Sequence, residues 1–310
     1  MITIRKSTEF GVQKIETLSD GAWVQLTDPS SLEMEQFNQE LEIPKDFITY
    51  SLDLDERARI EKENGNLLIV LRVPQFQGES ADIPYTTVPL GIVLSHKLII
   101  TVCKLDHEIL QRLSKGIARG FDTHKPIRFL LHIFHAAADE YLLYLREINK
   151  SVDLLEDQLE QSLRNKEVLK LLKYQKSLTY FTTALKSNSR MMTHLQNSRL
   201  FDQHPEDQDL LDDVLTEIGQ AIEMTEIASG ILSQMMDAFA SIISNNLNVV
   251  MKFLASITII LALPTLIASI YGMNIDLPLD SYPHAFGVTL GLSIAISGIV
   301  AIVFKKLGWL

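Results

Sequence analysis

The sequence predicts an α+β chain with three sections: an N-terminal α/β/α domain, a long helical stalk and two C-terminal helices that cross a membrane. Three observations predict this class. Short β-patterned runs alternate with helical ones over residues 1–125, apolar residues then recur at helical spacing up to residue 252, and two apolar runs of about 20 residues follow. The 310 residues are 46% hydrophobic with a mean hydropathy of +0.12, which is high for a wholly soluble protein.

The first 200 residues are expected to form a cytosolic domain. Its strand candidates are AWVQL, NLLIVLRVP and TVPLGIVLSHKLIITVC, and SSLEMEQFNQELEI is a helix that Ser30 or Ser31 can cap. Residues 126–200 turn wholly helical, with i, i+3, i+4 spacing in IRFLLHIFHAAADEYLLYLREINKSVDLLEDQL and again in VLKLLKYQKSLTYFTTALKSNSRMM. A long antiparallel pair of helices is therefore expected there.

Residues 201–252 are expected to form the stalk. Helical periodicity resumes near Gln208 and meets no proline until Pro264, which predicts one helix of about 60 residues, roughly 90 Å long. The stretch between Arg199 and Lys252 has no lysine or arginine but ten acidic residues: Asp202, Glu206, Asp207, Asp209, Asp212, Asp213, Glu217, Glu223, Glu226 and Asp237. If subunits pack these faces together, divalent cations or basic residues of another segment must intervene, and a solvated acidic face is the alternative.

The two apolar runs, residues 253–271 and 285–304, are each long enough to cross about 30 Å of hydrocarbon. Lysines lie outside the pair, at Lys252 and in the basic tail 305–310, whereas the linker 272–284 carries Asp276 and Asp280. The positive-inside rule therefore places both termini in the cytoplasm. Two buried core helices of a soluble protein are the alternative.

Composition and motifs exclude several classes of function. The net charge of −11 argues against nucleic acid as a partner, because binding it requires a basic face. The single cysteine, Cys103, allows neither an intrachain disulfide nor a cysteine metal cluster. No GxxxxGK[ST], dinucleotide-binding, HExxH or GxSxG motif occurs, so we expect neither an enzyme nor an organic cofactor. His132 and His135, at i, i+3, are interpreted as packing residues rather than zinc ligands.

A seam of small and polar residues follows the stalk into the first apolar run. Counting back from its end in steps of three and four gives Gly272, Ser269, Thr265, Ala262, Thr258, Ala255, Met251, Asn248, Ser244, Ser241 and Asp237. Such heptad spacing predicts left-handed coiling of several identical helices about a common axis. With enough copies the seam lines a pore, and with two or three it is a packing face.

At this point the residues resemble a known family. Tyr271-Gly272-Met273-Asn274 ends the penultimate apolar segment, a second span and a lysine-rich tail follow, and SLDLDERARIEKENGNLLIVLRVP, TVPLGIVLSHKLIITV and SNNLNVVMKFL extend the match. Together they are similar to the CorA family of magnesium transporters. The resemblance implies a funnel-shaped homopentamer in the lipid of the plasma membrane. It also implies that divalent cations are the partners and that Mg²⁺ is transported, with cobalt and nickel as further ions and Mg²⁺ acting as regulator as well.

The resemblance also implies roles for individual residues. Gly272, Met273 and Asn274 would form the selectivity filter, where five Asn274 carbonyls accept hydrogen bonds from the water shell that Mg²⁺ gives up reluctantly. The implied pore and gate residues are Asn248, Met251, Leu254, Thr265, Ser269 and the acidic ring at Asp237. Met251 and Leu254 would form a constriction that closes by dewetting. At these pore positions, the residues counted along the seam differ from those implied by the resemblance only at Leu254, in place of which the seam contains Ala255.

Regulatory Mg²⁺ would bind the stalk acids Asp213 and Glu217 between subunits. The acidic pair that faces the stalk in the family falls here on Thr49 and Tyr50, so Asp53 is the nearest candidate. Two alternatives stay open: a zinc transporter of the same superfamily, with or without proton coupling, and a membrane-tethered scaffold without permeation.

Overall fold

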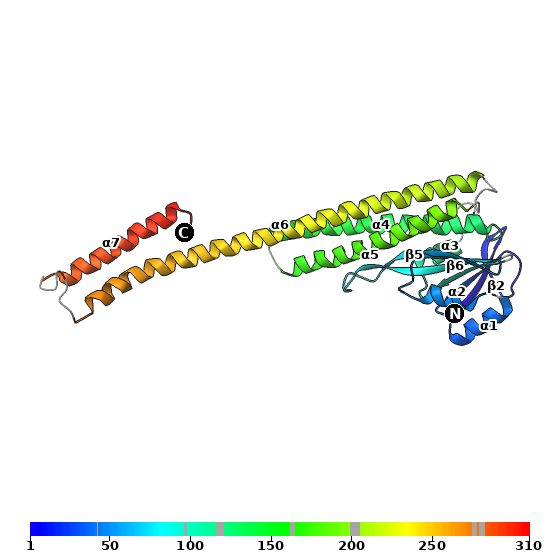
Figure 1. Cartoon of the computed structure of the whole chain (residues 1–310), viewed down its shortest axis with the longest axis horizontal. Helices are drawn as coiled ribbons and strands as arrows, with labels where there is room; N and C mark the ends of the chain where they lie inside the picture. The colour runs from blue at the N-terminus through cyan, green and yellow to red at the C-terminus, as the bar shows by residue number, and fades with distance from the viewer. Residues whose placement is uncertain are drawn as a thin grey trace. The chain divides into compact units, whose positions relative to one another are not determined.

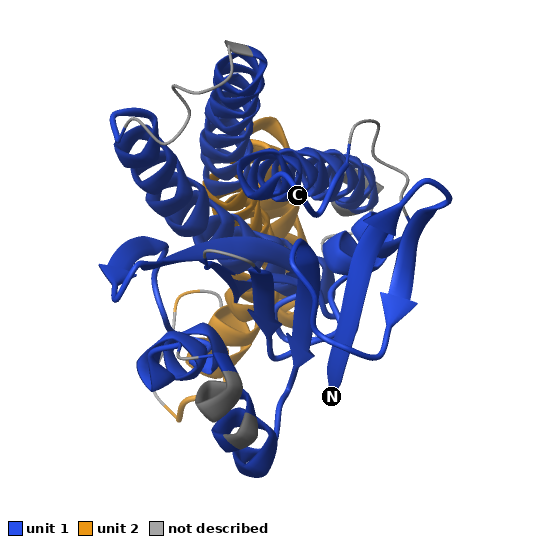
Figure 2. Cartoon of the chain, turned by 90° about the vertical axis from the view of Figure 1, so that its right-hand side faces the viewer, with its two compact units in different colours: residues 1–234 blue, residues 235–310 orange. Residues whose placement is uncertain are grey.

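The structure is a computed structural model of the chain, and it describes residues 1–41, 43–95, 98–115, 121–161, 165–198, 205–274, 278 and 283–310. Two compact units divide the chain, Met1–Gln234 and Met235–Leu310, and each is described by itself (Figure 2). Asp202, Asp276 and Asp280, which the sequence singled out, lie outside the described residues.

A seven-stranded mixed sheet forms the centre of the first unit (Figure 1). Its strands are β1 (Ile2–Thr8), β2 (Gly11–Ile15), β3 (Ala22–Thr27), β4 (Arg59–Glu63), β5 (Asn66–Phe76), β6 (Tyr85–Leu94) and β7 (Leu98–Cys103). Their order is β2-β1-β3-β7-β6-β5-β4, and only β3 and β7 pair in parallel. At the hairpin between β4 and β5, Asn64 and Gly65 have φ of 49° and 79°, the left-handed values that a tight turn between twisted strands requires.

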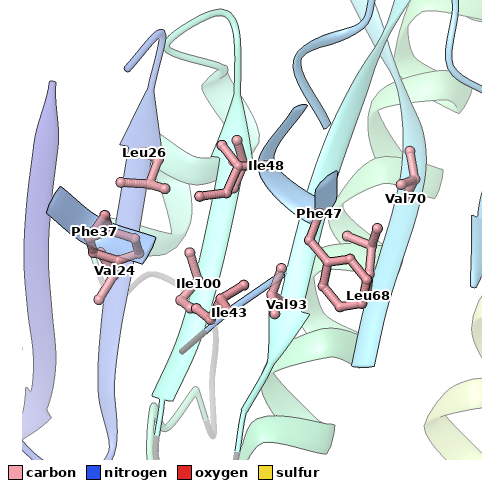
Figure 3. Close-up of a cluster of buried hydrophobic side chains, with 11 residues drawn as sticks. Val24, Leu26, Phe37, Ile43, Phe47, Ile48, Leu68, Val70, Val93 and Ile100 are labelled. Atoms are coloured by element: carbon pink, nitrogen blue, oxygen red, sulfur yellow. The ribbon is translucent and has the colours of Figure 1, made fainter. Parts of the chain in front are cut away.

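One face of the sheet is covered by α1 (Ser31–Leu41) and α2 (Lys45–Leu52). Ser30 is the residue that caps α1, because its backbone N–H donates to Glu33 Oε2 at 2.8 Å and Glu33 N–H donates back to its hydroxyl at 3.3 Å. The buried side chains of this layer form one apolar cluster, which includes Val24, Phe47 and Val93 (Figure 3).

The opposite face is covered by α3 (Glu108–Ser114), α4 (Pro126–Gln161) and α5 (Asn165–Gln196). Trp23 of β3 packs edge-on against Phe129 of α4, with ring centroids 5.2 Å apart. The pairing of β4 with β5 stops at Val70, and beyond it Asn188 of α5 accepts from the Arg72 N–H at 3.0 Å and donates to the Arg72 carbonyl at 2.7 Å. These two hydrogen bonds satisfy backbone groups that have lost their strand partner.

The long helix α6 runs from Pro205 to Tyr271, which confirms the single long helix expected from the sequence. In the first unit its buried residues recur every three or four positions: Leu211, Val214, Ile218, Ala221, Thr225, Ala228 and Leu232. Side chains of α4 and α5 join it. Gln175 donates to Ser229 Oγ at 2.9 Å, and Lys186 pairs with Glu226 at 2.6 Å.

The second unit holds the end of α6 and helix α7 (Ala285–Lys306), which continues two residues beyond the expected end at residue 304. Both helices are long and apolar enough to cross a membrane. Large apolar side chains along them are exposed, for example Leu261 at 66% and Ile294 at 63%, as a lipid-facing surface requires.

Candidate functional site

The seam on α6 is open to the surroundings along its whole length. All of its residues, from Asp237 to Gly272, are exposed in the chain. Residues two positions away, which lie roughly 200° around the helix, are buried at Met235, Phe239 and Ser256. Residues 240–255 of α6 are exposed on every side, so the seam is distinguished there by its small and polar side chains and not by its exposure.

The wall of the seam is polar but internally satisfied. Thr258 donates its hydroxyl proton to the Leu254 carbonyl at 2.8 Å, and Thr265 donates to the Leu261 carbonyl at 3.1 Å. Because the protons are used within the helix, the hydroxyl oxygens keep lone pairs that can accept hydrogen bonds from water. Pro264 cannot donate to the carbonyl of Ile260, which leaves that oxygen free of its usual helical partner.

The predicted gate residues are apolar and uncovered. Met251 and Leu254 are each 56% exposed, whereas Ser256, the polar residue lying off the seam, is fully buried. Asn248 lies one turn before Met251 and is exposed as well. Along this part of α6 the chain thus presents an exposed amide, followed by two exposed apolar side chains.

The Gly-Met-Asn segment extends α6 by part of a turn. Gly272 N–H donates to the Ala268 carbonyl at 3.0 Å, and Met273 N–H donates to the Ile270 carbonyl at 3.2 Å. Met273 and Asn274 are exposed, and the Tyr271 hydroxyl donates to the Pro278 carbonyl at 3.2 Å. The predicted filter residues therefore lie at the very end of the helix, with the Asn274 amide accessible.

In the first unit, the stalk acids meet groups of α4. His135 Nδ1 lies 3.1 Å from Asp139 Oδ2, and His135 Nε2 lies 3.5 Å from Glu217 Oε1. The second oxygen of Glu217, Oε2, is buried and has no hydrogen-bond partner. Burial raises the pKa of the Glu217 carboxyl; the His135 ring lowers it, while the charges of Asp139 and Asp213 raise it further.

The structure thus brings together some predicted regulatory residues and not others. Glu217 is in the cluster with His135 and Asp139, and Asp213 lies near enough to act on its charge. Asp53 instead ends α2, where its carboxylate accepts the Asp55 N–H at 3.1 Å. His135 does more than pack on the helix, because both of its ring nitrogens face carboxylates. The spacing of His135 and Asp139, i and i+4 on one helix, was the available signal.

Basic residues of α4 and α5 compensate part of the acidic stalk. Arg128 holds Glu206 at 2.8 Å and the buried Asp207 at 2.9 Å, and Lys186 holds Glu226. Asp209, Asp213, Glu223 and Asp237 remain exposed. Part of the acidic run is thus paired with basic residues of other helices of the same chain, and part is exposed.

The chain is similar to known proteins over most of its length. The family model described as CorA-like Mg²⁺ transporter protein matches residues 19–306. The chain belongs to this family. The cobalt/magnesium transport protein CorA of Methanocaldococcus jannaschii is 29% identical over 297 residues, which cover 93% of this chain and 91% of the relative. The magnesium transport protein CorA of Helicobacter pylori is 24% identical over 314 residues, or 97% and 93% of the two chains.

A solved structure supports the same assignment. The complete structure of the CorA magnesium transporter from Methanocaldococcus jannaschii matches with a TM-score of 0.87 and 26% identity, covering 100% of this chain and 99% of the other. The CorA resemblance and the fold class are therefore confirmed: a mixed-sheet N-terminal domain, one long helix and two apolar C-terminal helices.

Proposed function

We propose that this CorA-family chain is a homopentameric, channel-like transporter of hydrated Mg²⁺ that also admits Co²⁺ and Ni²⁺. It resides in the plasma membrane with both termini in the cytoplasm. The names of the relatives, which are magnesium and cobalt/magnesium transport proteins, support Mg²⁺ and Co²⁺ as the ions. The observation that carries the proposal is the uncovered seam of α6, which ends at an accessible Asn274 amide.

The seam supports assembly around an axis. A face of small and polar residues at heptad spacing packs against identical faces in a left-handed coil. All residues of the seam are exposed in the chain, so this face is free to meet neighbouring copies. A pentamer of 35.0 kDa chains has a protein mass of about 175 kDa, five times the mass of one chain, and native mass spectrometry measures it directly. A monomer or dimer would contradict the pore.

Selection at Asn274 follows from the hydration of magnesium. Mg²⁺ loses its water slowly, so a ring of amide oxygens that accepts hydrogen bonds from the bound water passes the ion without stripping it. The membrane potential then contributes about 4.6 kcal/mol per divalent ion at 100 mV. No nucleotide is needed for entry down this gradient.

The gate and the sensor lie further along α6. Met251 and Leu254 close the pore by excluding water from an apolar ring. Cytosolic Mg²⁺ binds the acids Asp213 and Glu217, with Asp53 and the Asp237 ring as further anionic positions, and holds the subunits in the shut state. Loss of the ion lets these carboxylates repel one another, which favours opening.

The test of conduction is metal uptake by liposomes that contain purified protein. Asn274→Ala should abolish the preference for Mg²⁺ over Ni²⁺ and Zn²⁺, or abolish uptake. Asn246→Ala is the matched control, because Asn246 is an exposed amide on the same helix but lies off the seam. If wild-type pentamers take up no divalent metal, the chain is a scaffold; if only Zn²⁺ enters, it is a zinc transporter.

The test of regulation uses right-side-out vesicles with high internal Mg²⁺. Uptake through Asp213→Ala should continue longer than uptake through the wild type, because one sensor carboxylate is missing. Asp209→Ala, an exposed acid one turn earlier on α6, is the control. An unchanged shut-off in Asp213→Ala would remove Asp213 from the sensor.

A further inference from the structure

A basic pocket lies between helix α5 and the sheet of the first unit. It is a cavity of about 610 Å³, within the range of about 300–1,000 Å³ that is usual for small-molecule sites. Its wall is formed by the loop between α2 and β4, by β5 and β6, and by one face of α5. None of the residues that line it belongs to the seam or to the acidic stalk, so the proposed function gives this pocket no role.

The pocket is positive although the protein as a whole is acidic. Its wall contains two acids and four basic residues: Arg57, Arg72, Lys186 and Arg190. Four positive charges less two negative ones leave a formal charge of +2, in a chain whose net charge is −11. Two neighbours outside the wall cancel in this count. Arg59 pairs with Glu56 of the wall at 3.2 Å, and Glu226 pairs with Lys186 at 2.6 Å. The pocket therefore attracts anions.

Two of the four cations are available to hold a ligand. Arg57 and Arg190 are exposed and form no ion pair with another described residue. A guanidinium of this kind binds phosphate oxygens in pairs. Arg72 instead makes five hydrogen bonds of 2.6 to 3.2 Å to backbone carbonyls and to the Thr87 hydroxyl, so it supplies charge rather than donors. Burial lowers the pKa of the Arg72 guanidinium, and an anion nearby would stabilise its charged form.

The face of α5 that lines the pocket has an aromatic end and a cationic end. Its residues follow one another in steps of three and four, which places them on one side of the helix: Tyr180, Thr183, Ser187 and Arg190. The first and last are ten positions apart, or about 15 Å along the helix axis at about 1.5 Å per residue. The Tyr180 side chain is 45% exposed, so a flat group in the pocket can stack on its ring. This spacing suits an elongated ligand with a planar ring at one end and negative charge at the other.

We propose that this pocket binds a nucleoside polyphosphate, with its phosphates on Arg57 and Arg190 and its base on Tyr180. The positive wall selects an anion, and the two guanidinium groups match phosphate oxygens. Inorganic phosphate fills only a small part of the cavity and has no ring to stack on Tyr180, so a nucleotide fits the wall better. Binding there does not depend on the proposed transport, because the two sites share no residue.

The test is calorimetric titration of the full-length protein in detergent, stripped of divalent metal beforehand so that chelation contributes no heat. ATP should bind at one site per chain at an ionic strength of about 0.15 M. Arg57→Ala and Arg190→Ala should each weaken ATP binding at least about tenfold, the effect of losing one hydrogen bond between charged groups. Tyr180→Leu should weaken ATP binding at least about fivefold but leave the binding of inorganic tripolyphosphate unchanged, because tripolyphosphate has no base to stack.

Two controls match these variants. Lys176→Ala and Arg146→Ala remove exposed cations of α5 and α4 that do not line the pocket, and both should bind ATP like the wild type. The proposal is overturned if the wild type binds no ATP, as when acids of another copy fill the pocket, or if Arg57→Ala and Arg190→Ala bind ATP no more weakly than the two controls. Unchanged ATP binding by Tyr180→Leu would overturn the nucleotide as the ligand. Loss of Mg²⁺ uptake in liposomes with ATP binding intact would instead overturn the proposed transport alone.

Discussion

A buried carboxyl on α4 should make the stability of the cytosolic domain depend on pH. Glu140 is 2% exposed; its Oε2 accepts from Arg112 Nη2 at 2.9 Å and its Oε1 accepts from the Tyr144 hydroxyl at 3.1 Å. Burial raises its pKa to about 7, although the Arg112 charge and the Tyr144 hydrogen bond act in the opposite direction. The perturbation that isolates this group is Glu140→Gln, which keeps the shape and the acceptor but cannot ionise.

The sign of the pH dependence follows from which state, folded or unfolded, binds the Glu140 proton more tightly. The folded chain binds a proton at Glu140 up to about pH 7, whereas the unfolded chain releases it near the ordinary value of 4.5. The free energy of unfolding therefore falls as pH rises between these values and levels off above them. At about 1.4 kcal/mol per pH unit, the fall over this interval has an upper limit of about 3.5 kcal/mol, and Glu140→Gln should lack it.

Thermal unfolding of the detergent-solubilised protein measures this difference, followed by the fluorescence of the buried Trp23. One kcal/mol shifts Tm by about 2–4 °C in a domain of this size, so the wild type should lose about 5–10 °C relative to Glu140→Gln from pH 5 to pH 8. The control is Glu147→Gln, on the same helix, because Glu147 also accepts a tyrosine hydroxyl but is exposed. Parallel pH curves for the wild type and Glu140→Gln would refute the reasoning.

Two further predictions concern packing in the same unit. Gly91→Ala should destabilise the protein by about 1–3 kcal/mol, because a Cβ at this position would overlap Ser51 Oγ. Gly219→Ala is the control: Gly219 has open space around it in α6, so the substitution should be neutral or stabilising. Thermal melts compare the two variants. Arg128→Ala should cost about 3 kcal/mol by leaving the buried Asp207 unpaired, and hydrogen exchange should rise at the start of α6. Adding Asp207→Asn should recover part of that loss, and no recovery would show that the ion pair is not the cause.

The helices could be predicted from the sequence because their signal is local. Apolar spacing along α4, α5 and α6 marks each helix, and the capping pair Ser30 and Glu33 marks the start of α1. The order of the strands in the sheet could not be predicted in this way, because it depends on pairing between distant segments of the chain. Among the described strands, the one parallel pairing, between β3 and β7, joins segments about 75 residues apart in the chain, and no short-range pattern specifies that choice.

The cytosolic cluster was hidden for the same reason. Glu217 lies 82 positions after His135, so the histidine could be judged only by its neighbours on α4. A carboxylate four residues from a histidine is common on helix surfaces and identifies no metal site alone. The acidic run was likewise visible in the sequence, but Arg128 and Lys186, which neutralise part of it, come from other helices.

The seam shows where periodicity stops being informative. Helix α6 carries two faces with the same spacing of three and four residues, and both satisfy the pattern of a helix that packs against a partner. In the second unit Met235, Phe239 and Ser256 are buried, but residues 240–255 between them are exposed on every side of α6. Leu254 and Thr258 are each two positions from Ser256, on the far side of the helix, and both are exposed. Since the chain leaves the whole seam exposed, the part of the seam within the apolar span must face lipid or another copy. Hydroxyls, an amide and a carboxylate are poor neighbours for lipid, so the composition of the uncovered face favours another copy.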